Sequence, residues 1–233
     1  MSVTGALARL TGVLTAGWGR RRYAWPVVLR EPAVTVRGLA RGPQTVVLRP
    51  LSVGDEGPWA RLRLADDARL SRWEASLPPG SGEIPPSFRR YVRRGWAQAR
   101  RGESMPLVLE VDGVFAGQVT VAPIQWGSLR QATVGYWIGS PWEGRGVMTL
   151  ALAMVIDHLL GPQVGLHRVE VAVRPDNARS LAVCRRLGLE REGLRRGLMH
   201  IDGEWADHVV HVRTAEQMEA DGALVARLAA RAG

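Results

Sequence analysis

The chain contains no lysine, so all 31 of its basic side chains are arginine. With 22 acidic side chains, its formal net charge is +9 at pH 7. An excess of positive charge favours acidic ligands, nucleic acid or ribosomal surfaces as partners. Total replacement of lysine by arginine, with abundant Ala and Gly, is also typical of coding bias. The charge alone therefore identifies no partner.

Cysteine is almost absent too. Cys184 is the only one, which excludes an intrachain disulfide and a multi-cysteine metal site. It lies in "SLAVCRRLG" on the expected inner face of a helix, so we expect it to be buried by packing. No apolar run is long enough to span a bilayer, and Arg9 interrupts the run near the start. We expect no signal peptide and a cytoplasmic protein.

The composition that remains is ordinary for a folded domain, with 46% apolar and 23% charged residues in 233 positions. That length supports one substantial core. We expect an extension over residues 1–43, a domain over residues 44–214 and a C-terminal helix over residues 215–233. The extension contains a possible helix near residues 4–16 and three arginines at 20–22. It would either pack as an arm or touch an anionic partner or membrane surface.

Hydrophobic periodicity predicts alternating helices and strands within the domain. Asp112-Gly113 and Asp202-Gly203 predict the turns of two hairpins, and Gly188 predicts a helix end. Asp55 or Gly54 is expected to cap an early helix. Expected strands lie near residues 45–51, 106–111, 114–124, 132–139 and 167–174, and expected helices near 87–101, 147–160 and 177–187. This order indicates a mixed α/β domain.

One stretch, "SPWEGRGVM" at residues 140–148, places two glycines around Arg145 just before a long apolar helix. Exposed N–H groups at a helix start, with an arginine beside them, predict a seat for phosphate. The stretch lacks the lysine and Ser/Thr of a nucleotide P-loop and does not fit the GxGxxG fingerprint. The stretch therefore gives little support to a kinase, an NTPase or a Rossmann dinucleotide-binding protein.

Three segments in order carry a more specific signal: "VGYWIGSPWEGRGVM", "HRVEVAVRPDNARSLAVCRRLGLEREG" and "IDGEWADHV". Together they resemble the GNAT superfamily of acetyl-CoA-dependent N-acetyltransferases, and are most similar to the RimJ/RimL group that acetylates N-termini of ribosomal proteins. The resemblance implies a mixed, mostly antiparallel central sheet with splayed central strands and flanking helices.

The resemblance also implies where acetyl-CoA binds. The family signature Q/R-x-x-G-x-G/A falls on Glu143 to Met148, with Glu and Met as departures at its two ends. The pyrophosphate would rest on the backbone of the loop, while the pantetheine arm pairs with the preceding strand. The cofactor-binding residues implied are Tyr136, Trp137, Ile138, Gly144, Arg145, Gly146, Val147, Met148, Thr149 and Asn177. Glu143 is expected to point away from the phosphates.

Catalytic residues are less clear from the sequence. Ser180 matches the position that faces the CoA sulfur, whereas the usual carboxylate base is replaced by Thr133. Glu192 is our first candidate for that base, with Glu110 and Glu74 as others. Trp73 and Glu74 resemble a Trp-Glu segment that the family places over the acceptor site, so we predict that they bind the acceptor. The spacing of His167, His200, His208 and His211 predicts no metal site, and we expect no metal cofactor.

These features predict an N-acetyltransferase that uses acetyl-CoA to modify a protein N-terminal amine, and the resemblance suggests a ribosomal protein as the acceptor. One alternative is acetylation of a small-molecule amine on the same scaffold. Another is a non-catalytic CoA- or ribosome-binding protein, which would explain Thr133, Glu143 and the basic charge. The oligomeric state stays open.

Overall fold

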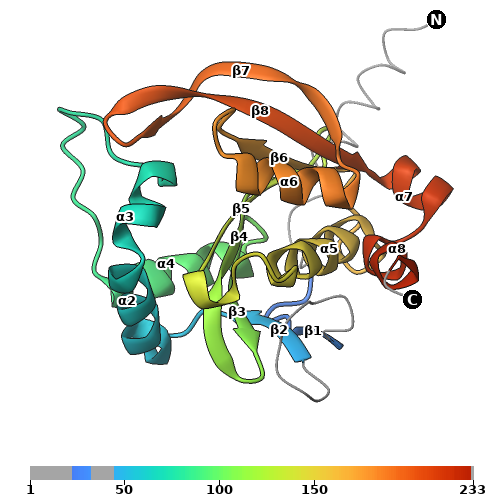
Figure 1. Cartoon of the computed structure of the whole chain (residues 1–233), viewed down its shortest axis with the longest axis horizontal. Helices are drawn as coiled ribbons and strands as arrows, with labels where there is room; N and C mark the ends of the chain where they lie inside the picture. The colour runs from blue at the N-terminus through green and yellow to red at the C-terminus, as the bar shows by residue number, and fades with distance from the viewer. Residues whose placement is uncertain (1–22, 33–44, 232–233) are drawn as a thin grey trace, which may run out of the picture.

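The computed structural model describes residues 23–32 and 45–231. Its centre is a sheet of eight strands in the order β1-β2-β3-β4-β5-β6-β8-β7 (Figure 1). Only the β5–β6 pair is parallel, and every other neighbouring pair is antiparallel. The strands are β1 Leu29–Pro32, β2 Thr45–Pro50, β3 Met105–Val111, β4 Val114–Gln125, β5 Gln131–Ile138, β6 Arg168–Val173, β7 Glu190–Ile201 and β8 Glu204–Thr214. The expected mixed, mostly antiparallel sheet is confirmed.

Helices cover both faces of this sheet. They are η1 Val53–Asp55, α2 Glu56–Ala65, α3 Asp67–Leu70, η2 Ser71–Trp73, α4 Phe88–Arg100, η3 Ser140–Trp142, α5 Val147–Leu160, α6 Ala178–Leu187, α7 Ala215–Asp221 and α8 Leu224–Ala230. Helix α4 packs on β3 and α2 on β4, whereas α5 contacts α6, α7 and α8. Figure 1 shows α2 and α3 at one side of the molecule and α7 and α8 at the other.

Helix α5 forms the centre of the main core. Twelve of its fourteen residues are buried, as its nearly continuous apolar sequence predicts. Side chains of β2, β3, β4, β5 and β6 close around it. Cys184 of α6 belongs to the same core and is fully buried as expected, and burial raises the pKa of its thiol to about 12. No described helix is both long enough and apolar enough to cross a bilayer.

The predicted hairpins are present. Asp112 and Gly113 have φ of 49° and 77° between Val111 and Val114, which pair across β3 and β4. Asp202 and Gly203 connect β7 to β8 in the same way, with φ of 49° and 88°. Both positive dihedrals are those a two-residue turn of this kind requires. The two hairpins set the order of four of the eight strands.

Residues 29–32 of the expected extension form β1, which pairs with β2, so this part packs as an arm, one of the two alternatives expected. The helix expected near residues 4–16 lies outside the described residues. Two other details differ from the sequence-based picture. The C-terminal helix is two helices, because Gly222 between them has φ of 84°. Asp55 is the N-cap residue of α2, as expected, but its side chain makes no cap hydrogen bond there. The side chain instead accepts from the Ser52 amide in a capping box of η1 and from Arg49.

Candidate active site

The two central strands diverge and leave an open edge. β5 and β6 pair only from Gln131–Arg168 to Thr133–Glu170. Beyond Thr133, β5 stays paired with β4 as far as Ile138, while β6 follows β8. The edge of β5 that faces β6 thus has no partner strand over residues 134–138, which include Tyr136, Trp137 and Ile138. The splay that the resemblance implies is confirmed, and an extended chain can pair with this edge.

The open edge leads directly to the glycine loop. Gly144 and Gly146 have φ of 71° and 89°, and Gly146 is the residue from which α5 begins. The N–H groups of Val147, Met148 and Thr149 in the first turn have no acceptor within a helix. No acidic side chain lies in that turn. The loop and helix start therefore fit a pyrophosphate, which is held by backbone N–H groups and a helix dipole.

Glu143, just before the glycines, is held by two arginines. Its carboxylate lies 2.8 Å from Arg69 Nη1 and 3.3 Å from Arg179 Nη1. Arg69 also donates to the carbonyl of Ile138 at 2.6 Å, so it joins α3 to both ends of the loop. Glu143 stands where the family signature has Gln or Arg, and the two guanidinium groups offset its negative charge.

Asp66, between α2 and α3, is a second anchor for the loop. It is buried, accepts the Ser140 amide at 2.6 Å, and pairs with Arg69 at 2.6 Å. Burial raises the pKa of the Asp66 carboxyl, but the hydrogen bonds from Arg69 and Ser140 outweigh this and leave the pKa below its ordinary value. The start of the glycine loop is thus fixed to the helices on the opposite side of β5.

Asn177 and Ser180 lie at the start of α6, beside the open edge. The Asn177 side chain accepts the Ser180 amide at 3.1 Å, which caps the helix and leaves the Ser180 hydroxyl unused by the cap. The Tyr136 hydroxyl is buried near Ser180 and Cys184. Burial raises the pKa of Tyr136, with Cys184 adding to this and Ser180 opposing it. The structure therefore places two hydroxyls together where the sequence indicated one.

The face of β5 that carries Thr133, Gly135 and Trp137 is open at Gly135. A Cβ added at Gly135, between Thr133 and Trp137, would meet no atom within 4 Å. The Arg63 guanidinium lies over Trp59 and Trp137, 4.9 and 5.2 Å from the two ring centroids. Arg63 also pairs with one oxygen of Glu74, while Glu74 Oε1 is buried and has no hydrogen-bond partner among the described residues.

Trp73, at the end of η2, contacts two arginines. Arg72 and Arg174 lie over its ring at 4.4 and 5.8 Å from the centroid. The following segment is joined to β7, because the Ser76 amide donates to the His200 carbonyl at 2.8 Å. Arginines contact both predicted acceptor residues, Arg72 at Trp73 and Arg63 at Glu74, and their role at an acceptor site stays a prediction.

Glu170 is the carboxylate that sequence reasoning missed. It is the cross-strand partner of Thr133 at the point where β5 and β6 separate, and it is 2% exposed. Its Oε1 accepts from Arg168 at 2.6 Å and from Arg195 at 3.0 Å. Cross-strand partners point to the same face of a sheet. The family often has a carboxylate at the position of Thr133 on β5. Here the carboxylate beside that position is Glu170, which comes from β6.

The other candidate bases are differently placed. Glu192 is exposed on β7, where Arg168 donates to it at 3.0 and 2.8 Å and thereby lowers its pKa. Glu110 pairs with Arg49, which also binds Asp55. Glu110 joins β3 to β2 through Arg49, away from β5 and β6. Glu192 shares Arg168 with Glu170, but it is exposed whereas Glu170 is buried. Across residues 23–32 and 45–231, no group of three His, Cys, Asp or Glu side chains is arranged to hold a metal ion.

Comparison with known proteins gives one consistent result. A model of the "Acetyltransferase (GNAT) domain" family matches residues 45–190. The solved structure described as "Mycobacterium smegmatis RimJ in complex with CoA-disulfide" is 37% identical, with a TM-score of 0.77 over 89% of this chain and 95% of that one.

Two curated relatives match over shorter stretches. The probable N-acetyltransferase YjcK of Bacillus subtilis is 35% identical over 42% of this chain and 54% of its own. The [ribosomal protein uS5]-alanine N-acetyltransferase of Escherichia coli is 39% identical over 38% of this chain and 45% of its own. The chain thus aligns with about half the length of these two relatives. With the family match covering well over half of the chain, this protein belongs to the GNAT acetyltransferase family.

Proposed function

We propose that this protein transfers the acetyl group of acetyl-CoA to the N-terminal amine of a protein, and that its acceptor is a ribosomal protein. The observation that carries the proposal is the continuous path from the open edge of β5 to the glycine loop and the start of α5. The relative from Escherichia coli acts on a ribosomal protein, and the similar mycobacterial structure holds CoA. Work on a ribosomal protein would place this enzyme in the cytoplasm.

In this proposal, residues 144–149, including Arg145, bind the pyrophosphate, mainly through backbone N–H groups. Residues 136–138 pair with the pantetheine arm, and Asn177 holds the start of α6 beside it. Acetyl-CoA supplies an acetyl group activated as a thioester. Glu143 keeps its charge away from the phosphates because Arg69 and Arg179 hold it.

The acceptor enters over the opposite face, between Trp73 and Trp137. The unpartnered Glu74 oxygen provides an acceptor for an ammonium group, and the tryptophans provide apolar walls. The acceptor nitrogen forms the new bond to carbon as the carbon–sulfur bond breaks, so the nitrogen must lose a proton and the sulfur must gain one. We assign Glu170 as the group that accepts the proton from the nitrogen, directly or through water. We assign Ser180 as the donor to the sulfur.

An N-terminal amine suits this site better than a lysine. Its pKa of about 7.7–8.0 leaves about one-seventh of it neutral at pH 7, whereas a lysine is neutral only about once in a few thousand. An acceptor amine that is already partly neutral needs little help from a base to lose its proton.

The test is to incubate the pure protein with acetyl-CoA and N-terminal peptides of the ribosomal proteins, and to follow thiol release and peptide mass. We expect one acetyl group on the α-amine of a restricted set of peptides. Binding of acetyl-CoA without acetylation of any peptide would refute the proposal. Acetylation of polyamines or amino acids but no peptide would favour the small-molecule alternative.

A further inference from the structure

The solvent-facing side of α4 consists almost entirely of arginine. At 100° per residue, six arginines and Ala97 fall within one continuous sector of this helix and its C-cap. The arginines are Arg89, Arg90, Arg93, Arg94, Arg100 and Arg101, and all six are exposed. We call this surface the α4 arginine face. The opposite side of the helix packs on β3.

Five of these six charges are not neutralised by any residue that the structure describes. Arg101 pairs with Glu103, and none of the other five forms an ion pair with a described residue. The sequence outside the described ranges contains no Asp or Glu, so it has no carboxylate side chain to offer. Coding bias explains arginine in place of lysine, but it does not explain six arginines and no acid over fourteen consecutive positions. An unneutralised surface of this kind attracts a polyanion.

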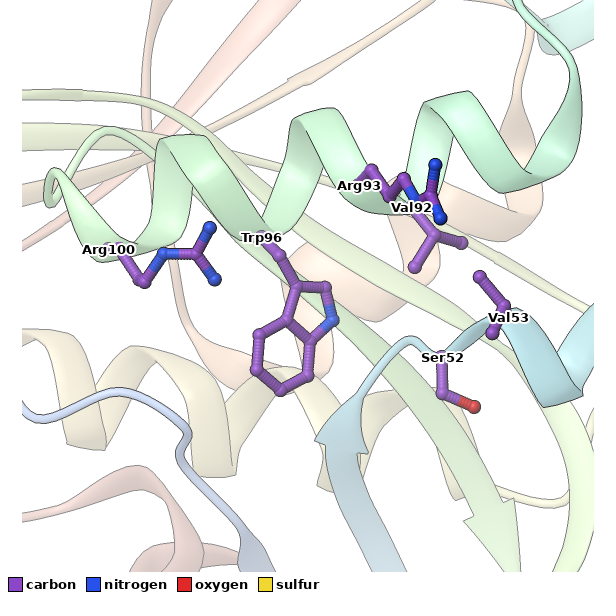
Figure 2. A pocket seen from close by; sticks show the side chains of 6 residues that line it. All are labelled: Ser52, Val53, Val92, Arg93, Trp96 and Arg100. Atoms are coloured by element: carbon purple, nitrogen blue, oxygen red, sulfur yellow. The ribbon is translucent and has the colours of Figure 1, made fainter.

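A hollow of about 560 Å³ borders the same face (Figure 2). Figure 2 shows the Trp96 ring in this hollow, with Arg93 and Arg100 along the helix on either side of it. Ser52, Val53 and Val92 complete the lining. Trp96 is fixed, because its Nε1 donates to the Leu51 carbonyl at 2.7 Å and its ring meets Trp25 edge-on at 5.6 Å.

We infer that the α4 arginine face binds single-stranded RNA, with phosphates on the arginines and an unpaired base in the hollow beside Trp96. Guanidinium forks match phosphate geometry, and a base can stack on an aromatic ring. Arg89, Arg93 and Arg100 form one row that rises by about 6 and then about 10.5 Å along the helix. Arginines in such a row can contact successive phosphates along the backbone of a bound RNA strand. The acidic side chains of a peptide would bind the same cations but carry no ring that could stack on Trp96.

The choice of RNA among nucleic acids rests on the proposed function, since a ribosomal protein presents its N-terminus beside RNA. Helix α4 lies next to the acceptor face: Phe88 packs on Trp59 with ring centroids 5.2 Å apart, and Tyr91 accepts from Gln118 at 2.7 Å. RNA held on α4 would therefore lie close to the proposed acceptor entrance.

The test measures anisotropy of a labelled single-stranded RNA of about 12 nucleotides, which is within the range of sites for such proteins. The variant Arg93→Gln/Arg100→Gln is compared with Arg185→Gln/Arg186→Gln, which removes the same charge from an exposed part of α6. We expect the α4 pair to weaken binding at least 10-fold and to reduce the slope of log affinity against log salt by about 1.4, for two lost phosphate contacts. The α6 pair should change affinity less than about 3-fold.

A second pair of variants tests the hollow. Val53→Glu puts a carboxylate at its lining, whereas Val114→Glu makes the same change at another exposed valine, in the turn region of the β3–β4 hairpin. Only Val53→Glu should weaken RNA binding.

Equal losses in the two arginine pairs would overturn the inference, because net charge alone would then explain binding. Competition by polyglutamate as strong as that by unlabelled RNA would also overturn it, in favour of an acidic protein partner. Acetylation of a free peptide, which should be unchanged in the α4 pair, reports on the proposed function separately.

Discussion

Glu170 is the side chain on which the proposed proton transfer depends. Replacing it with Gln keeps an oxygen for Arg168 and Arg195 but removes the base. We expect Glu170→Gln to lower kcat/KM for a peptide acceptor by about 100-fold, the lower end of the usual range for a general base. The loss should shrink as the pH rises above about 8, where the acceptor amine is already neutral. A pH profile of kcat/KM measures both effects.

Glu192→Gln is the matched control, because Glu192 also binds Arg168 but lies exposed on β7. It should leave kcat/KM within about 3-fold of the unmodified protein. A larger loss in Glu192→Gln than in Glu170→Gln would assign the base as the sequence alone suggested. A loss in Glu170→Gln that is the same at every pH would indicate a purely structural carboxylate.

Ser180 is expected to act on the leaving sulfur. Ser180→Ala removes the hydroxyl without touching the helix cap, since Asn177 binds the Ser180 backbone amide. We expect kcat to fall by about 100-fold, with acetyl-CoA affinity nearly unchanged. Turnover assays and calorimetric titration with acetyl-CoA separate the two quantities. Equal losses in both would make Ser180 a binding residue, and would direct attention to the neighbouring Tyr136 hydroxyl.

Individual residues were predictable from sequence where a local rule applies. Cys184 is buried because the amphipathic pattern of α6 places it inward, and Asp112 and Asp202 form turns because each precedes a glycine. Glu170 was not predictable, because the alternation in "HRVEVAVR" marks it as the polar, solvent-facing side of a strand. Its burial comes from Arg195 of β7, a contact across 25 positions of sequence.

The glycine loop depends on backbone conformation more than on side chains. Gly146 has φ of 89°, where a β-branched residue is strained by about 1–3 kcal/mol. We expect Gly146→Val to weaken acetyl-CoA binding at least 10-fold in a calorimetric titration, both by strain and by blocking close approach to the phosphates. Gly127→Val introduces comparable strain at φ of 73° in the loop before β5 and should leave acetyl-CoA affinity unchanged. Unchanged affinity in Gly146→Val would place the phosphate site elsewhere.

The segment between α2 and α3 holds that loop in place. Asp66→Asn should raise the KM for acetyl-CoA and lower the free energy of unfolding by about 2 kcal/mol at neutral pH, because buried hydrogen bonds from Arg69 and Ser140 lose their ionic partner. The folded state lowers the pKa of Asp66, so this stabilisation is present above about pH 4 and is lost as the pH falls further.

Denaturant unfolding between pH 3 and 7 tests the prediction, with Asp67→Asn as the control at the adjacent, exposed carboxylate. The difference between Asp66→Asn and the unmodified protein should shrink toward low pH. A difference that is constant with pH would show that the ionised carboxylate contributes nothing.

Most whole elements could be predicted, because their causes are local. The apolar run of α5, the arginine-rich α4 and the two Asp-Gly hairpins each lie within a short window of sequence. The C-terminal segment was expected as one helix because its two halves are both good helix formers. Its division depends on Gly222 and on Asp157 of α5, which accepts the amides of Leu224 and Val225 at 2.8 and 2.9 Å. Because Asp157 is far away in the sequence, no pattern near Gly222 predicts that a second helix begins there.

The molecule as a whole is closed at one end by α8 packing on α5. Leu224 is 1% exposed and belongs to the main core, although it lies only nine positions before Gly233. We expect Leu224→Ala to lower the free energy of unfolding by about 2–4 kcal/mol through the cavity it leaves. Leu64→Ala, at a leucine that is 78% exposed, should change it by less than about 0.5 kcal/mol. Equal effects in thermal or denaturant unfolding would show that α8 is not part of the core.

The short pairing between β5 and β6 has a consequence for the whole sheet. Only three residue pairs join β5 to β6, from Gln131–Arg168 to Thr133–Glu170. Over residues 134–138, the backbone amides of β5 that point away from β4 therefore have no partner strand. In deuterated solvent these amides should exchange quickly beside neighbours that are among the slowest in the protein. When an extended molecule pairs with this edge of β5, it should slow hydrogen exchange at the amides that it covers. The number of protected amides would then show how much of the edge the bound molecule occupies.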